Sequence, residues 1–151
     1  MSVHDSSDHP LDYPIWTALT TTQQALAEGD GRARRYPTDM TPFADMPDLS
    51  AENFAVLRAM MSSNDVAVLF TPEAVTPPVG FNVVLADTGE QMIGTPVETP
   101  TDGVDIVTLG ADDVPAMLEL TALTKPGPFS VRTHELGTFL GIRVDGQLAA
   151  M

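Results

Sequence analysis

Residues 104–151, VDIVTLGADDVPAMLELTALTKPGPFSVRTHELGTFLGIRVDGQLAAM, decide the fold of this chain. Apolar runs, a helix start, a Pro-Gly-Pro break and an Asp-Gly turn signal follow one another here. In chain order they predict a strand (Val104–Leu109), a helix capped by Asp112 with Pro115 in its first turn and ended by Pro126-Gly127-Pro128, a strand (Thr138–Val144), a type I′ turn (Asp145-Gly146) and a returning strand (Gln147–Met151). Because the last strand has no turn signal or neighbour beyond it, we expect an unfinished sheet.

The preceding hundred residues predict a smaller lobe. Pro14 starts a helix that we expect to reach Glu28 and to stop at Gly29-Asp30-Gly31. The other expected elements are a loop (Arg32–Pro47) pinned by Tyr36, Met40 and Phe43, a helix (Ala51–Met61) capped by Ser50, a buried strand (Val66–Phe70), extended runs (Phe81–Ala86 and Gln91–Gly94) and a linker (Val97–Gly103). We therefore expect a small α/β lobe over residues 1–100 and a second unit over residues 101–151.

Composition excludes several classes of protein. The net charge is −14 with only seven basic residues, which argues against nucleic acid as a partner because such binding depends on Lys and Arg. The chain has no cysteine, so it has no disulfide framework, thiol nucleophile or cysteine-ligated zinc. Without a long apolar run or a signal peptide, a cytoplasmic protein with no membrane partner is expected.

Several short motifs in residues 112–148 resemble one known family. They are Asp112-Asp113-Val114-Pro115-Ala116-Met117-Leu118-Glu119-Leu120-Thr121, Thr124-Lys125-Pro126-Gly127-Pro128-Phe129, Arg132-Thr133-His134-Glu135-Leu136-Gly137 and Gly141-Ile142-Arg143-Val144-Asp145-Gly146-Gln147-Leu148. These motifs resemble those of bacterial N-acetyltransferases of the GNAT superfamily, and residues 14–61 are similar to the N-terminal extension of such enzymes. The resemblance implies a mixed, mostly antiparallel α/β (α+β) fold, acetyl-CoA as co-substrate and a small-molecule or peptide amine as acceptor.

The donor-binding motif of that family has no match in this sequence. The resemblance implies an Arg/Gln-x-x-Gly-x-Gly/Ala turn whose backbone N–H groups hold the pyrophosphate at a helix N-terminus. Gly29-Asp30-Gly31-Arg32 lacks that spacing, and the family's later strands, which often supply a Tyr general acid, are missing too. We therefore expect this chain to carry only the N-terminal part of the fold, to have no cofactor-binding residues of that type and to be inactive by itself.

The candidate substrate-binding residues are Phe129, Arg132, Thr133 and His134. The resemblance places them just past the first helix of the fold, where the acceptor enters. Arg132 could hold an acidic group of the acceptor with Thr133 beside it, or it could cap the loop or pair with Glu135. His134 could act as a general base, or it could be an ordinary loop residue. No second histidine follows at the spacing of a zinc peptidase; the catalytic residues stay unknown and no metal site is expected.

Two functions from different classes remain open. The first is a GNAT-type acetyltransferase of which this chain is the N-terminal part. The second is a non-enzymatic interaction module that pairs through its exposed strand edge. If the chain is natively this short, we expect a homodimer that buries Gln147–Met151.

Overall fold

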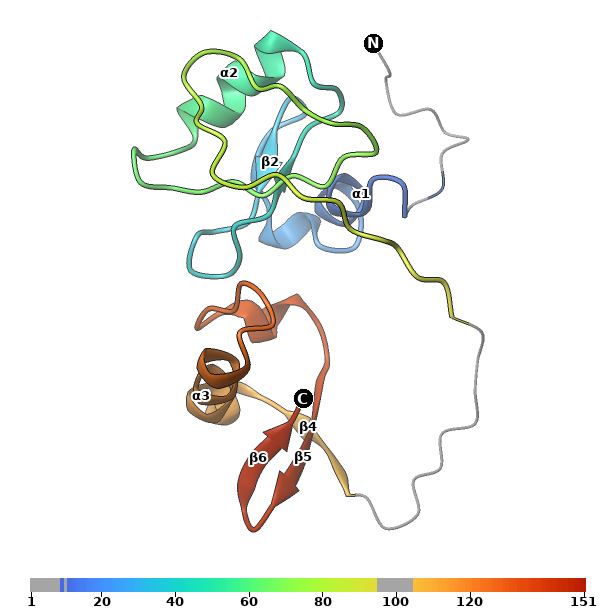
Figure 1. The fold of residues 1–151 in the computed structure, drawn as a ribbon, viewed down its shortest axis with the longest axis vertical. Helices are drawn as coiled ribbons and strands as arrows, with labels where there is room; N and C mark the ends of the chain where they lie inside the picture. Colours follow the sequence, from blue (N-terminus) through green and yellow to red (C-terminus); the bar gives the residue numbers. More distant parts are fainter. Residues whose placement is uncertain (1–8, 10, 95–104) are drawn as a thin grey trace.

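The computed structural model describes residue 9, residues 11–94 and residues 105–151 (Figure 1). Residues 11–94, the N-terminal half, and residues 105–151, the C-terminal half, each contain a three-stranded antiparallel sheet. The two halves lie one above the other in Figure 1. The predicted linker Val97–Gly103 and the predicted boundary at residue 100 lie outside the described residues.

The N-terminal half begins with a helix that is shorter than predicted. Helix α1 spans Pro14–Thr20, and the 3-10 turn η1 spans Gln24–Leu26. The expectation of one helix to Glu28 was wrong, because three consecutive threonines follow the first two turns. The Thr20 and Thr21 hydroxyls donate to the carbonyls of Trp16 and Thr17, and β-branched residues that bond the backbone in this way disfavour the helix interior.

Three two-residue strands follow in the order β1-β2-β3, namely β1 (Glu28–Gly29), β2 (Arg34–Arg35) and β3 (Ala44–Asp45). The expected loop 32–47 therefore contains two strands of a small sheet. Tyr36 and Met40 are buried, as predicted, and form a cluster with Leu19 against which Phe43 packs. Arg35 forms an ion pair with Glu28 of the neighbouring strand β1 and another with Asp65 outside the sheet, both at 2.9 Å.

Helix α2 spans Ala51–Ala59 and covers a second core cluster. Ser50 is its N-cap and accepts a bond from the Asn53 backbone N–H, which confirms the predicted start. Phe54 and Leu57 are buried with residues from the small sheet and its flanks, namely Ala33, Ala44 and Met46. Met60 is the C-cap, so the helix ends two residues before the expected Met61.

The segment 66–94 forms no strand. The predicted strand Val66–Phe70 was wrong: Phe43 and Val68 form an isolated parallel bridge, and Val66 is 54% exposed. The predicted runs Phe81–Ala86 and Gln91–Gly94 lie in backbone without helix or strand, and Val84 is 82% exposed. A strand requires a hydrogen-bonded neighbour along its length, and among the described residues only Pro42–Ala44 bonds alongside Val68.

The C-terminal half matches the prediction more closely. Its sheet has the order β4-β5-β6, with β4 (Ile106–Leu109), β5 (Phe139–Val144) and β6 (Gln147–Ala150) all antiparallel. Asp145 and Gly146 connect β5 to β6 with positive φ angles of 50° and 81°, which is the backbone of a type I′ turn.

Helix α3 (Val114–Thr124) lies between β4 and β5 in the chain, after the 3-10 turn η2 (Ala111–Asp113). Pro115 occupies its first turn, as predicted. The predicted cap, Asp112, was wrong by one residue: Asp113 is the N-cap position of α3 and makes no side-chain cap bond to it. Its carboxylate accepts the Gly110 N–H at 2.9 Å at the start of η2. Lys125, at a left-handed φ of 49°, ends the helix just before Pro126. Among the described residues, no helix has the length and apolarity needed to cross a membrane.

Candidate functional site

The predicted substrate-binding residues lie on one turn, residues 129–136, which we call the docking turn. It connects α3 to β5 and contains the 3-10 turn η3 (Thr133–Leu136). In Figure 1 the docking turn is the part of the C-terminal half that faces the N-terminal half. Phe129, the first residue of the turn, is anchored to the sheet because its ring packs edge-on against Phe139 of β5, with centroids 5.8 Å apart.

Arg132 is held by two carboxylates. Its Nε and one terminal nitrogen donate to Glu135 at 2.8 and 2.9 Å, and the other terminal nitrogen lies 3.3 Å from Asp39 of the N-terminal half. The pairing with Glu135, which the sequence left open, is therefore present. The bidentate bond raises the pKa of Arg132 and lowers the pKa of Glu135. Both groups therefore stay charged across the neutral range.

Thr133 is buried and fastens the docking turn to the N-terminal half. Its hydroxyl donates to the Met40 carbonyl at 2.5 Å and accepts from the Ser130 backbone N–H at 2.7 Å. One residue earlier, the Arg132 backbone N–H donates to the Asp39 carbonyl at 3.1 Å. Two adjacent residues of the turn are thus bonded to two adjacent residues of the other half.

His134 is half-buried, and its Nδ1 lies 3.1 Å from the Val131 carbonyl oxygen. A hydrogen bond to this carbonyl, which can only accept, would place the proton of the neutral ring on Nδ1. The lone pair of Nε2 is then the one that can take a proton. This is the tautomer that a general base acting through Nε2 needs.

Sequence reasoning missed Gln23, which contacts the same turn. The Gln23 side-chain nitrogen donates to the Leu136 carbonyl at 2.5 Å across 113 positions of sequence. The Gln23 side-chain oxygen accepts from the Tyr36 hydroxyl, whose pKa is raised by burial. Gln23 follows a polar threonine run and carries no motif, so only the folded arrangement could reveal this contact.

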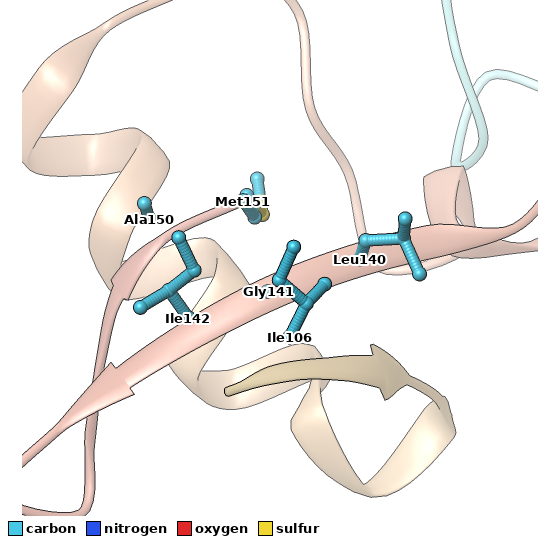
Figure 2. Close-up of a pocket in the computed structure, with 6 residues that line it drawn as sticks. All are labelled: Ile106, Leu140, Gly141, Ile142, Ala150 and Met151. Atoms are coloured by element: carbon cyan, nitrogen blue, oxygen red, sulfur yellow. The ribbon is translucent and has the colours of Figure 1, made fainter. Parts of the chain in front are cut away.

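A shallow apolar depression of about 260 Å³ lies on the C-terminal sheet. Figure 2 shows its lining residues on β4, β5 and the C-terminal strand: Ile106, Leu140, Gly141, Ile142, Ala150 and Met151. None of these side chains is polar, so the depression offers no general acid, base or ligand for a charged group. Within residues 9, 11–94 and 105–151, no three His, Asp or Glu residues are placed to hold a metal ion.

Among solved structures, this chain is similar to a crystal structure from Novosphingobium aromaticivorans DSM 12444 of a protein assigned as an acetyltransferase from the GNAT family. The sequence identity is 34%, the TM-score is 0.74, and the match covers 94% of this chain. This chain has a GNAT-type fold. The sequence matches no protein-family model and no curated protein.

The GNAT-type chain spans 62% of the length of the matched structure. Since the match includes nearly all of this chain, it extends over both the N-terminal half and the sheet that follows it. The mixed fold expected from the motifs in residues 112–148 is confirmed. In this GNAT-type fold, the docking turn lies between helix α3 and strand β5.

Proposed function

We propose that this chain is the N-terminal part of an N-acetyltransferase that moves an acetyl group from acetyl-CoA to an amine acceptor. The observation that supports it is the similarity, at 34% identity and a TM-score of 0.74, to the protein assigned to the GNAT family. In the reaction the amine nitrogen bonds to the thioester carbonyl carbon and the carbon–sulfur bond breaks. The amine loses one proton and the departing thiolate gains one.

In this proposal the docking turn lies on the acceptor side of the site. The four predicted binding residues, Phe129, Arg132, Thr133 and His134, have different tasks there. Arg132 and Thr133 hold the turn in shape through their bonds to Glu135 and Met40. The Nε2 atom of His134 takes the proton that the amine loses, because its other ring nitrogen already bonds the Val131 carbonyl.

The proposal assigns donor binding to protein outside these residues. The sequence contains no Arg/Gln-x-x-Gly-x-Gly/Ala run, and the matched structure is longer than this chain. The test is a calorimetric titration with acetyl-CoA of the chain and of a chimera in which the part of the matched protein that lies outside the match is joined to it. We expect the chimera to bind acetyl-CoA and the unextended chain not to bind it. Binding by the unextended chain would refute this assignment, and a chimera that folds without binding would refute the transferase proposal.

Activity of the same chimera tests the role of His134. His134→Asn keeps a side-chain donor near the Val131 carbonyl but removes the proton acceptor. We expect release of the CoA thiol, measured with a panel of primary amines, to fall by about 10²- to 10⁴-fold. The matched control is His9→Asn, which changes an exposed histidine outside the turn and should leave the rate unchanged. Equal rates in the His134 variant and the wild type would exclude it as the base.

A second candidate function is an interaction module that forms a homodimer through β6. Strand β6 is bonded to β5 on one side and has no second strand neighbour among the described residues. Its sequence, Gln147–Ala150, carries no charge, and the nearby Leu140, Val144 and Met151 are exposed. An uncharged strand edge beside exposed apolar side chains favours pairing with another strand.

Light scattering of the 151-residue chain tests the module. We expect a dimer that Ala150→Lys on β6 converts to a monomer, because edge lysines oppose strand pairing. Ala122→Lys on the exposed side of α3 is the matched control and should leave the dimer intact. A monomeric wild-type chain at high concentration would remove this candidate.

A further inference from the structure

We propose that the N-terminal half positions the docking turn, with Gln23 as the positioning residue in a relay from Tyr36 through Gln23 to Leu136. The contacts of Gln23 with Tyr36 and Leu136 set the orientation of Arg132 and His134. The link to acceptor binding rests on the proposed function. The relay itself is a property of the fold and can be tested without any acetyl transfer.

The Gln23 amide is fixed at both of its ends. The Leu136 carbonyl can only accept, so the Gln23 nitrogen must face it. The oxygen then faces the Tyr36 hydroxyl, which donates to it. Turning the amide over would bring two oxygens together at the Leu136 carbonyl. Only one orientation of the Gln23 side chain therefore satisfies both partners.

The other end of the relay is immobilised by packing. Tyr36 is 4% exposed and lies in one cluster with Leu19 and Met40. The Leu136 side chain packs against that same cluster, so the residue whose carbonyl Gln23 binds is also held through its side chain. The Tyr36 phenol, the Gln23 amide and the packed Leu136 side chain together fix the position of the last residue of the turn.

The beginning of η3 is fastened to the same part of the N-terminal half. The Thr133 hydroxyl bonds the Met40 carbonyl, and the Arg132 backbone bonds Asp39. His134 lies between these two anchored points, Thr133 and Leu136. Its orientation, and that of the Arg132–Glu135 pair, therefore depends on residues that lie more than 90 positions earlier in the chain.

Hydrogen exchange of the full 151-residue chain tests the relay. Gln23→Met keeps the length of the side chain but removes both hydrogen bonds. One lost bond of about 1 kcal/mol corresponds to about 5-fold faster opening, so we expect the amides of Arg132, Thr133 and Glu135 to exchange about 5-fold faster. Amides of α2 and β5 should keep their rates. Gln24→Met changes the exposed neighbour and is the matched control, which should alter none of these rates.

Two further variants separate the relay from simple packing. Gln23→Glu has nearly the same shape but has no donor for the Leu136 carbonyl, so it should speed exchange in the turn at least as much as Gln23→Met. Tyr36→Phe removes only the hydroxyl that orients the amide and should have a smaller effect. Unchanged exchange of the turn in Gln23→Glu, or equal acceleration across the whole chain in Gln23→Met, would overturn the proposal.

The relay and the proposed function fail in different experiments. Normal exchange in the Gln23 variants would remove the relay while leaving acetyl-CoA binding by the chimera to support the transferase. A chimera without acetyl-CoA binding would remove the transferase while leaving the exchange result to support the relay.

Discussion

Gly29 is the residue at which the backbone of the small sheet tolerates the least change. Its φ is +102°, a region that residues with a side chain rarely adopt. A Cβ at this position would lie 2.2 Å from the Ala33 carbonyl oxygen, and that oxygen cannot move freely because it accepts the Asp30 N–H in the turn. A side chain at residue 29 would therefore face both a strained backbone angle and a collision with the Ala33 carbonyl.

We expect Gly29→Ala to lower the free energy of unfolding by about 2–4 kcal/mol, since one strained φ alone costs about 1–3 kcal/mol. Urea unfolding followed by fluorescence measures the change. Gly31→Ala is a matched control two residues away, because a Cβ there meets nothing within 4 Å. It should leave the stability unchanged or raise it by up to about 1 kcal/mol. A Gly29 variant as stable as the Gly31 variant would contradict this account.

Asp65 makes the stability depend on pH. Its carboxylate accepts the Ser62 backbone N–H at 3.0 Å and the Arg35 guanidinium at 2.9 Å, and these bonds lower the pKa of Asp65. A carboxyl whose pKa is lower in the folded state stabilises the fold above its unfolded pKa, near 4, and stops doing so as the pH falls through the folded value.

Thermal unfolding between pH 6 and pH 3 tests this dependence with Asp65→Asn. The melting temperature of the variant should lie below that of the wild type at pH 6, and the gap should narrow as the pH falls below the unfolded pKa near 4. Asp112→Asn, at an exposed carboxyl of η2, should follow the wild type at every pH. A gap of constant size would show that Asp65 acts by packing rather than by its charge.

Apolar residues were easier to place from sequence than polar ones. Tyr36 and Met40 were expected to pin residues 32–47 and are buried, because large apolar side chains have few favourable positions outside a core. Gln23 and Asp45 gave no such signal. A polar side chain is exposed unless the fold brings it a partner, and the partners of these two lie 113 and 29 positions away.

Among the elements, those with a specific local signal were predicted well. The β5–β6 hairpin has an Asp-Gly turn and α2 has a Ser cap, and both formed as expected. Val66–Phe70 has a strong apolar pattern, but within residues 9, 11–94 and 105–151 no strand pairs with it along its length, so it is no strand. The sequence records the tendency to pair, whereas the partner depends on the arrangement of the whole half.

Helix α1 takes its N-terminal cap from another element. Its own N-cap residue, Tyr13, makes no side-chain cap bond. Instead Asp45 of β3 accepts the Trp16 backbone N–H at 3.1 Å through one oxygen and the Met46 N–H at 2.8 Å through the other. Asp45 is 3% exposed, and a buried carboxylate needs such donors because its charge is otherwise costly.

Asp45→Asn should therefore loosen the contact between α1 and the small sheet. One of the two acceptor oxygens becomes an NH₂ group that faces a backbone N–H, and we expect a loss of about 1–3 kcal/mol in unfolding free energy. Urea denaturation measures it, with Asp87→Asn in the exposed segment 82–90 as the control. If both variants are equally stable, Asp45 does not cap α1.

At the scale of the molecule, the two halves differ in how much core they bury. Most buried apolar side chains belong to the N-terminal half: Leu19, Ala33, Tyr36, Met40, Ala44, Met46, Phe54 and Leu57. The C-terminal half buries Leu109 and Met117. The docking turn bonds the C-terminal half to Gln23, Asp39 and Met40 of the N-terminal half. Because the C-terminal half has the smaller core, the two halves should differ in local stability.

Native-state hydrogen exchange in increasing urea tests this difference. We expect the β5 amides to exchange through an opening that needs less free energy than the opening of α2, because the sheet β4-β5-β6 has the smaller core. Leu57→Ala, at a fully buried position of α2, should lower the α2 opening by about 2–5 kcal/mol and leave the β5 opening unchanged. Leu123→Ala, 81% exposed on α3, should change neither. A single opening free energy shared by α2 and β5 would mean that the docking turn couples the two halves into one cooperative unit.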